Sequence, residues 1–192
     1  REKAAVNLVK EKLNKEARFA LDPTLLLNKD EYERIFKKQN LPTNQGIYTY
    51  ILDNCNWKKQ VLEVTKNKLG LEQFSNQHND NGIADKKIPS IESWIKGFAD
   101  ADFIITDSFH GTVFSIIFDK PFISLVNFNR GASRFESLLR ELGLTERSLG
   151  QFDKEKLIAI LTSDFNTERS QKKLRILKEH SLNLLENSLF NL

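Results

Sequence analysis

The sequence predicts an α/β fold with a mostly parallel sheet flanked by helices, and three observations support this. Segments rich in β-branched and aromatic residues alternate with segments of helical periodicity. The loops between them are short, as they are in βαβ units. The segment 103–105 is continuously apolar (Phe-Ile-Ile), which is typical of a strand that is buried on both faces of a parallel sheet.

The first 46 residues are expected to form helices and turns. Apolar residues on one side of segment 1–15 indicate an amphipathic helix, and the pair Asp22-Pro23 ends a short apolar run. A second helix is expected over 29–36. Turn-forming residues without apolar periodicity make 40–46 the best candidate for a linker.

From residue 47 onward, strands and helices alternate. Ser90 is expected to cap one helix at its start, and Gly143 is expected to end another. The expected strands are 47–52, 71–74, 103–106 and 121–126. The expected helices are 57–68, 91–98, 113–118, 135–142 and a long one over about 167–189.

Composition excludes several classes of protein. The 29 basic and 26 acidic residues give a net charge of only +3, which argues against a nucleic-acid partner. Cys55 is the single cysteine, so no internal disulfide or cysteine-rich metal site can form, and three scattered histidines argue against a metal site. No apolar stretch has the ~20 residues of a membrane span.

Because the chain starts at Arg1 and contains no Met, it is expected to be a piece of a longer protein.

Chemistry-bearing residues gather where the strand 103–106 ends and the next helix begins. Ligands of α/β proteins bind at the carboxyl ends of strands, where a helix N-terminus offers N–H groups to an anion. Ser108, Thr112 and the N–H of Gly111 could surround a phosphate or carboxylate, and His110 could donate a proton or act as a cation. The alternative is simple helix capping, with Asp107 or Ser108 as N-cap.

The residues around this tip resemble the polysaccharide pyruvyl transferase family. The most specific block is Ser-Phe-His-Gly-Thr over 108–112, and the resemblance covers most of the chain in the same order. The resembling segments are 1–5, 21–27, 88–94, 101–118, 120–122 and 130–139.

The resemblance implies a GT-B-like fold of two facing Rossmann-like domains, with the active site between them. Residues 1–40 would then be the end of a truncated N-terminal domain. Residues 41–192 would be the C-terminal Rossmann-like domain with its long C-terminal helix. The implied enzyme transfers a pyruvyl group from phosphoenolpyruvate to sugar hydroxyls of a bacterial polysaccharide or its lipid-linked precursor, forms a ketal and releases phosphate. The expected location is the cytoplasm, with no further cofactor and no metal.

Phosphoenolpyruvate carries a carboxylate and a phosphate, so its site needs cations and a proton carrier. His110 suits the second role. Arg130 and Arg134 suit the first, because guanidinium binds such groups in a bidentate fork, and Arg1 matches an arginine of the family's middle region. For Arg134 the alternative is surface pairing with Glu136 or Glu141.

Two other functions stay open from the sequence. One is a GT-B-like glycosyltransferase that uses a nucleotide-sugar, and the other is a non-enzymatic carbohydrate-binding domain. With the N-terminal domain missing, this chain alone is expected to be inactive or nearly so.

Overall fold

The computed structural model of the chain describes residues 2–77, 89–127 and 131–190. The chain divides into two compact units. One consists of residues 28–126 and 147–164 and holds the sheet, so we name it the sheet unit. The other consists of 1–27, 127–146 and 165–192 and is named the helical unit. The predicted boundary near residue 40 stays a prediction about a longer protein.

The sheet unit contains five parallel strands in the order β2-β1-β3-β4-β5, which confirms the α/β class. Residues Ile47 and Tyr50 of β1 pair with Phe103 and Thr106 of β3, and Ile104 of β3 pairs with Phe122 of β4. The strands are β1 (Ile47–Tyr50), β2 (Gln73–Phe74), β3 (Phe103–Thr106), β4 (Phe122–Leu125) and β5 (Ser148–Leu149). The sequence predicted the first four, and the two-residue β5 is too short to give a periodic signal.

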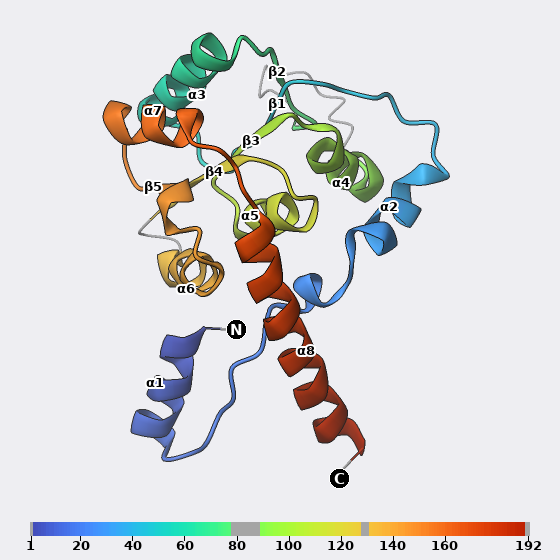
Figure 1. Cartoon of the computed structure of the whole chain (residues 1–192), viewed down its shortest axis with the longest axis vertical. Helices are drawn as coiled ribbons and strands as arrows, with labels where there is room; N and C mark the ends of the chain where they lie inside the picture. The colour runs from blue at the N-terminus through green and yellow to red at the C-terminus, as the bar shows by residue number, and fades with distance from the viewer. Residues whose placement is uncertain (1, 78–88, 128–130, 191–192) are drawn as a thin grey trace, which may run out of the picture. The chain divides into compact units, whose positions relative to one another are not determined.

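Helices cover both faces of this sheet (Figure 1). The helices of this unit are α2 (Lys29–Lys37), which packs on α4, and α3 (Asn56–Leu69), α4 (Ile91–Asp100), α5 (Phe109–Ile117) and α7 (Lys154–Thr162). The helices α3 and α7 pack together over one face, and α4 and α5 pack over the other. As predicted, the side chain of Ser90 caps α4 by accepting a hydrogen bond from the N–H of Ser93.

The two faces of the sheet have different cores. The buried core between the sheet and the helices α3 and α7 is aliphatic apart from Phe103, and its strand residues include Ile47, Ile105 and Ile123. On the opposite face, Tyr48 contacts Phe98 edge-on with ring centroids 4.8 Å apart. Burial of so much apolar surface supplies most of the stabilisation of such a unit. It also fixes the strand ends, from which the functional residues extend.

The helical unit contains α1 (Lys3–Leu13), α6 (Ala132–Leu142), α8 (Glu168–Phe190) and the 3₁₀ turn η1 (Pro23–Leu26). Helix α6 contacts both α1 and α8. Lys3 forms an ion pair of 2.7 Å with Glu141, and the N–H of Leu21 donates to the Ser181 hydroxyl at 2.9 Å. Gly143 ends α6 in the left-handed conformation, as predicted. A second 3₁₀ turn, η2 (Thr145–Arg147), leads into β5. Within the described residues, no helix is long and apolar enough to span a bilayer.

Candidate functional site

The strand order creates a switch point between β1 and β3. From β1 the chain continues to β2 on one side, and it then crosses through α4 to β3 on the other side. In doubly wound sheets, the carboxyl ends of the two strands at such a point border the usual ligand crevice. Here the residues that follow β1 and β3 are 51–55 and 107–108.

Asp107 binds these two strand ends together. Its carboxylate accepts hydrogen bonds from the N–H of Leu52 at 2.7 Å and of Asp53 at 3.0 Å. It also accepts one from Nζ of Lys58 at 2.6 Å, and 5% of the Lys58 side chain and 1% of the Asp107 side chain are exposed. Lys58 donates a further hydrogen bond to the carbonyl of Asp53. Asp107 is therefore a buried bridge and not the helix cap that the sequence had left open.

Ser108 is the N-cap of α5, because its hydroxyl accepts a hydrogen bond from the N–H of Gly111 at 3.3 Å. The N–H of Ser108 donates to the Thr106 hydroxyl, which itself donates to the carbonyl of Tyr50. Helix capping, one of the two interpretations of the sequence, is thus part of the structure. The first turn of α5 is fixed to both β1 and β3.

Gly111 and Thr112 lie against the sheet. A Cβ atom at Gly111 would lie 2.2 Å from Oγ1 of Thr106, so a side chain at this position would push α5 away from β3. Thr112 is completely buried, and its hydroxyl lies 2.7 Å from that of Ser124 on β4. Their expected contact with a ligand stays a prediction. In this structure, Gly111 and Thr112 allow α5 to pack closely against β3 and β4.

His110 differs from its neighbours at the tip because its side chain is exposed. It lies in the first turn of α5, and its ring meets that of Phe109 edge-on with centroids 5.5 Å apart. Asp107, Ser108 and Thr112 are all buried. The tip therefore presents a histidine to solvent on a turn that buried hydrogen bonds hold in place.

The three predicted arginines stay predictions as ligands of the donor. Arg134 lies on α6 of the helical unit and is half-buried. Its guanidinium lies over Gly131, where a Cβ atom would come within 2.8 Å of Nη2. Glu141, one of the two glutamates suggested as partners of Arg134, pairs with Lys3. Arg1 and Arg130 lie outside the described residues.

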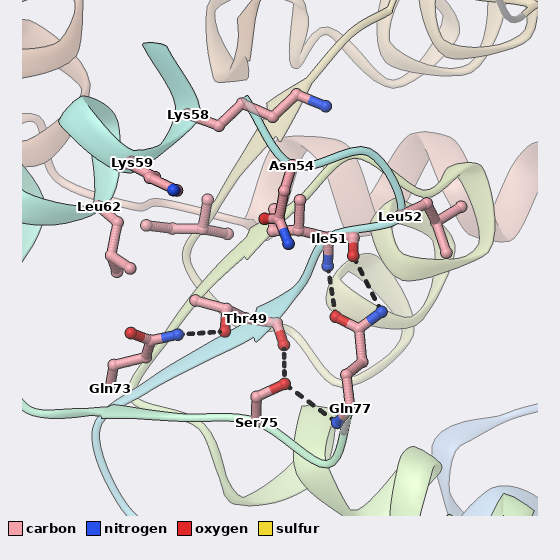
Figure 2. A pocket seen from close by; sticks show the side chains of 11 residues that line it. Thr49, Ile51, Leu52, Asn54, Lys58, Lys59, Leu62, Gln73, Ser75 and Gln77 are labelled. Carbon is pink, nitrogen blue, oxygen red and sulfur yellow. Dashed lines mark hydrogen bonds between the residues drawn. The ribbon is translucent and has the colours of Figure 1, made fainter. Parts of the chain in front are cut away.

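A pocket of about 260 Å³ lies where β1 and β2 end, beside the first turns of α3 (Figure 2). Three side chains, one on β2 and two just after it, form one wall of the pocket. They hydrogen-bond to β1 and to the residue that follows it. Gln73 donates to the Thr49 hydroxyl, Ser75 donates to the Thr49 carbonyl, and Gln77 bonds to both the N–H and the carbonyl of Ile51. The residues lining the pocket are Thr49, Ile51, Leu52, Asn54, Lys58, Lys59, Leu62, Gln73, Ser75, Gln77 and Ile105.

No pocket at this place was predicted from the sequence, because the hydrogen bonds that form its wall join residues 24 to 26 positions apart. A signal was present in the spacing: the polar residues at 73, 75 and 77 recur with period two, the period of side chains that share one face of a strand. Within the described part of the chain, no three histidine, cysteine, aspartate or glutamate side chains are grouped to hold a metal ion.

Comparisons with known proteins give one family. The sequence model of the family described as polysaccharide pyruvyl transferase matches residues 1–129, which is more than half of the 192 residues. No curated protein sequence matches the chain.

Two solved structures resemble the chain. One is described as the glycotransferase of kitacinnamycin, with 14% identity and a TM-score of 0.47, and the match covers 78% of this chain and 45% of that one. The other is the apo UGT2 of Phytolacca americana, with 13% identity and a TM-score of 0.40, and the match covers 97% of this chain and 49% of that one. The chain thus spans less than half the length of either protein.

Proposed function

The chain belongs to the polysaccharide pyruvyl transferase family, and on that premise we propose that it supplies part of the donor site of such an enzyme. The donor is phosphoenolpyruvate, and the acceptor is a sugar of a bacterial polysaccharide or of its lipid-linked precursor. The supporting observation is that the matched span, residues 1–129, includes the strand tip on which His110 is exposed. The reaction takes place in the cytoplasm, before the polysaccharide is exported.

The chemistry of the reaction defines what the site must provide. The C3 carbon of phosphoenolpyruvate accepts a proton, and a sugar hydroxyl adds to C2 while losing its own proton. Phosphate then leaves C2, and a second hydroxyl of the sugar takes its place and gives up its proton to the departing phosphate, which completes the ketal. The site therefore needs a group that carries a proton and groups that stabilise the negative charge of the departing phosphate.

We assign the first role to His110. Imidazole changes its protonation state near neutral pH, and this one lies on a helix turn where aligned N–H groups favour an anion. The buried bonds of Ser108 and Thr112 keep that turn in place. In this proposal Ser108, Gly111 and Thr112 act chiefly by positioning the turn, so that its backbone faces the donor.

Arginines are proposed as the cations that bind the donor's carboxylate and phosphate. Arg1 lies within the span that matches the family model, whereas Arg130 and Arg134 follow its end. Bidentate binding by guanidinium suits both anionic groups. The assignment of these three residues rests on residue type and on the family resemblance.

The test uses a protein that joins this chain to the expected N-terminal domain. It is incubated with phosphoenolpyruvate and an oligosaccharide acceptor, and phosphate release is measured together with the pyruvate ketal by NMR. Formation of both products in equal amounts is expected. Turnover of a nucleotide-sugar without consumption of phosphoenolpyruvate would overturn the proposal.

A histidine pair provides the matched comparison. The variant H110A should lower kcat by about a hundredfold or more, the usual contribution of a general acid or base. The variant H180A removes an exposed histidine from α8 and should leave kcat unchanged. Equal activities of the two variants would remove His110 from the mechanism.

A further inference from the structure

The pocket beside α3 has a rigid polar wall. The carboxamide of Gln77 bonds to the N–H of Ile51 at 2.7 Å and to its carbonyl at 2.9 Å, so it continues the edge of β1. Ser75 donates to the Thr49 carbonyl at 2.9 Å and accepts from the N–H of Gln77. Side chains held in this way lose little freedom when a ligand arrives, which favours binding.

The charge of the pocket is positive. Its lining contains two lysines and no carboxylate. Lys58 is neutralised by Asp107. Lys59 is exposed, and in the described part of the chain its ammonium has no ion pair or hydrogen bond. The side chain of the N-cap, Cys55, makes no capping bond, so the positive end of the α3 dipole adds to the attraction for an anion.

Uncommitted polar atoms lie opposite one another across the pocket. Gln73 uses Nε2 to donate to Thr49, which leaves Oε1 as an acceptor for a ligand. The carboxamide of Asn54 has no hydrogen bond within the described residues, so it offers both a donor and an acceptor. Figure 2 shows Asn54 and Lys59 on the α3 side and Gln73 on the opposite side. Amides arranged in this way suit the hydroxyls of a small polyol.

The size and the apolar surface of the pocket further restrict the kind of ligand that it can bind. Its volume of about 260 Å³ lies below the usual range of about 300–1,000 Å³ for cofactor and drug sites. That is too small for a whole nucleotide-sugar and large enough for one sugar ring. Ile51, Leu62 and Ile105 add an apolar surface against which the C–H face of a ring can pack.

We propose that this pocket binds a single anionic sugar, a hexose that carries a phosphate or a carboxylate. Lys59 contacts the anionic group, and Asn54 and Gln73 contact ring hydroxyls. The site is separate from the exposed His110, and binding there needs no pyruvyl transfer. Phosphate and carboxylate share the same electrostatic chemistry here, so the test includes both.

Binding is measured by NMR titration of the isotope-labelled chain with glucose 6-phosphate, glucuronate, glucose and inorganic phosphate. We expect one or both anionic sugars to shift the side-chain amide signals of Asn54, Gln73 and Gln77 and to bind more tightly than glucose or inorganic phosphate. The stronger of the two identifies the anionic group. Absence of shifts at these amides with both anionic sugars at about 10 mM, far above the ~1 mM Kd that marks weak binding, would overturn the proposal.

Variants of α3 show whether an anionic sugar binds through Lys59 in the pocket or through the overall positive charge of the helix. K59Q should weaken the binding of the anionic sugar about fivefold, the upper range for a partly exposed ion pair, and should leave the binding of glucose unchanged. K68Q removes the same charge from an exposed position on the same helix outside the pocket and should bind as the parent does. N54A should weaken the binding of anionic and neutral sugars alike. Equal binding by K59Q and K68Q would refute the role of Lys59 and with it the proposed site.

Discussion

The ammonium nitrogen of Lys58 lies 2.6 Å from Oδ2 of Asp107, and both side chains are almost completely buried. Two backbone N–H groups, those of Leu52 and Asp53, share the same carboxylate. A buried carboxylate is tolerated when it is paired and hydrogen-bonded as fully as this one. The pair therefore fixes the loop after β1 to the end of β3. Helix α5, with His110 in its first turn, begins just after this point.

Substitution of Asp107 should destabilise the sheet unit strongly. In D107N the shape is kept but the charge is lost, so Lys58 becomes an unpaired buried cation. We expect the free energy of unfolding to fall by about 3 kcal/mol, the lower end for breaking a buried ion pair. Urea unfolding followed by circular dichroism measures this loss.

Three further variants show whether the loss comes from the pair. E33Q alters a carboxylate that pairs with Lys37 at the surface of α2, where about 0.5 kcal/mol or less is expected. The double variant K58M/D107N removes both charges and should lose less than the sum of the losses of D107N and of the single variant K58M, because no buried charge is left alone. Additive losses would show that Lys58 and Asp107 are not energetically coupled.

A substitution at Gly111 can show whether this glycine is needed for the packing of α5 or for contact with a ligand. Exchange of glycine for alanine within a helix normally stabilises by about 1 kcal/mol. In G111A, however, the new methyl group would meet Thr106 at 2.2 Å. We expect a net loss of about 2 kcal/mol from this overpacking, measured as a lower urea midpoint without any ligand.

Relief of the contact gives the internal control. T106A removes both Oγ1 and Cγ2, the atoms that the methyl group would strike. If the contact with Thr106 causes the loss, G111A should cost less in the T106A background than in the parent. If G111A is as stable as the parent, the contact with Thr106 does not require a glycine here, and close approach of a ligand to the backbone would be the favoured explanation.

The fold could be predicted because its signals are local. The apolar run 103–105 indicated a buried parallel strand, and Phe103, Ile104 and Ile105 are all buried in β3. Ser90 and Gly143 mark a helix start and a helix end by mechanisms that involve only a few residues. The two-residue strands are different. A strand was predicted over 71–74, but only Gln73 and Phe74 of β2 pair with β1, since tertiary pairing decides where so short a strand ends.

The site could be predicted less well, because its contacts join distant parts of the chain. The bond between Lys58 and Asp107 spans 49 residues, and Gln77 reaches Ile51 across 26 residues. No periodicity within one segment carries that information. The tip at 107–112 was found because its residues are adjacent in sequence. Which of them are buried depends on how α5 packs against β3 and β4, and that packing separates exposed His110 from buried Thr112.

Tyr48 makes the stability of the sheet unit sensitive to alkaline pH. Burial, with a smaller effect from the charge of Tyr50, raises the pKa of Tyr48 far above its ordinary value of 10.0, and burial also raises the pKa of Tyr50. Above about pH 10 the unfolded chain releases these phenolic protons while the folded chain keeps them. Stability is therefore fully present below that pH and is lost as pH rises, by up to about 1.4 kcal/mol per pH unit for Tyr48 and by less for the partly exposed Tyr50.

The variant Y48F tests this dependence and the state of the buried hydroxyl together. Among the described residues, the hydroxyl of Tyr48 has no hydrogen-bond partner, and an unpaired buried hydroxyl costs stability. At pH 7 we expect Y48F to be as stable as the parent or more stable by about 1 kcal/mol. Between about pH 9 and pH 11 its stability should fall less steeply, with the slope due to Tyr50 remaining. Urea midpoints across that range measure both effects, and Y50F, which removes the less buried phenol, serves as the comparison. A parent and a Y48F variant with identical alkaline slopes would mean that the Tyr48 phenol also loses its proton in the folded state.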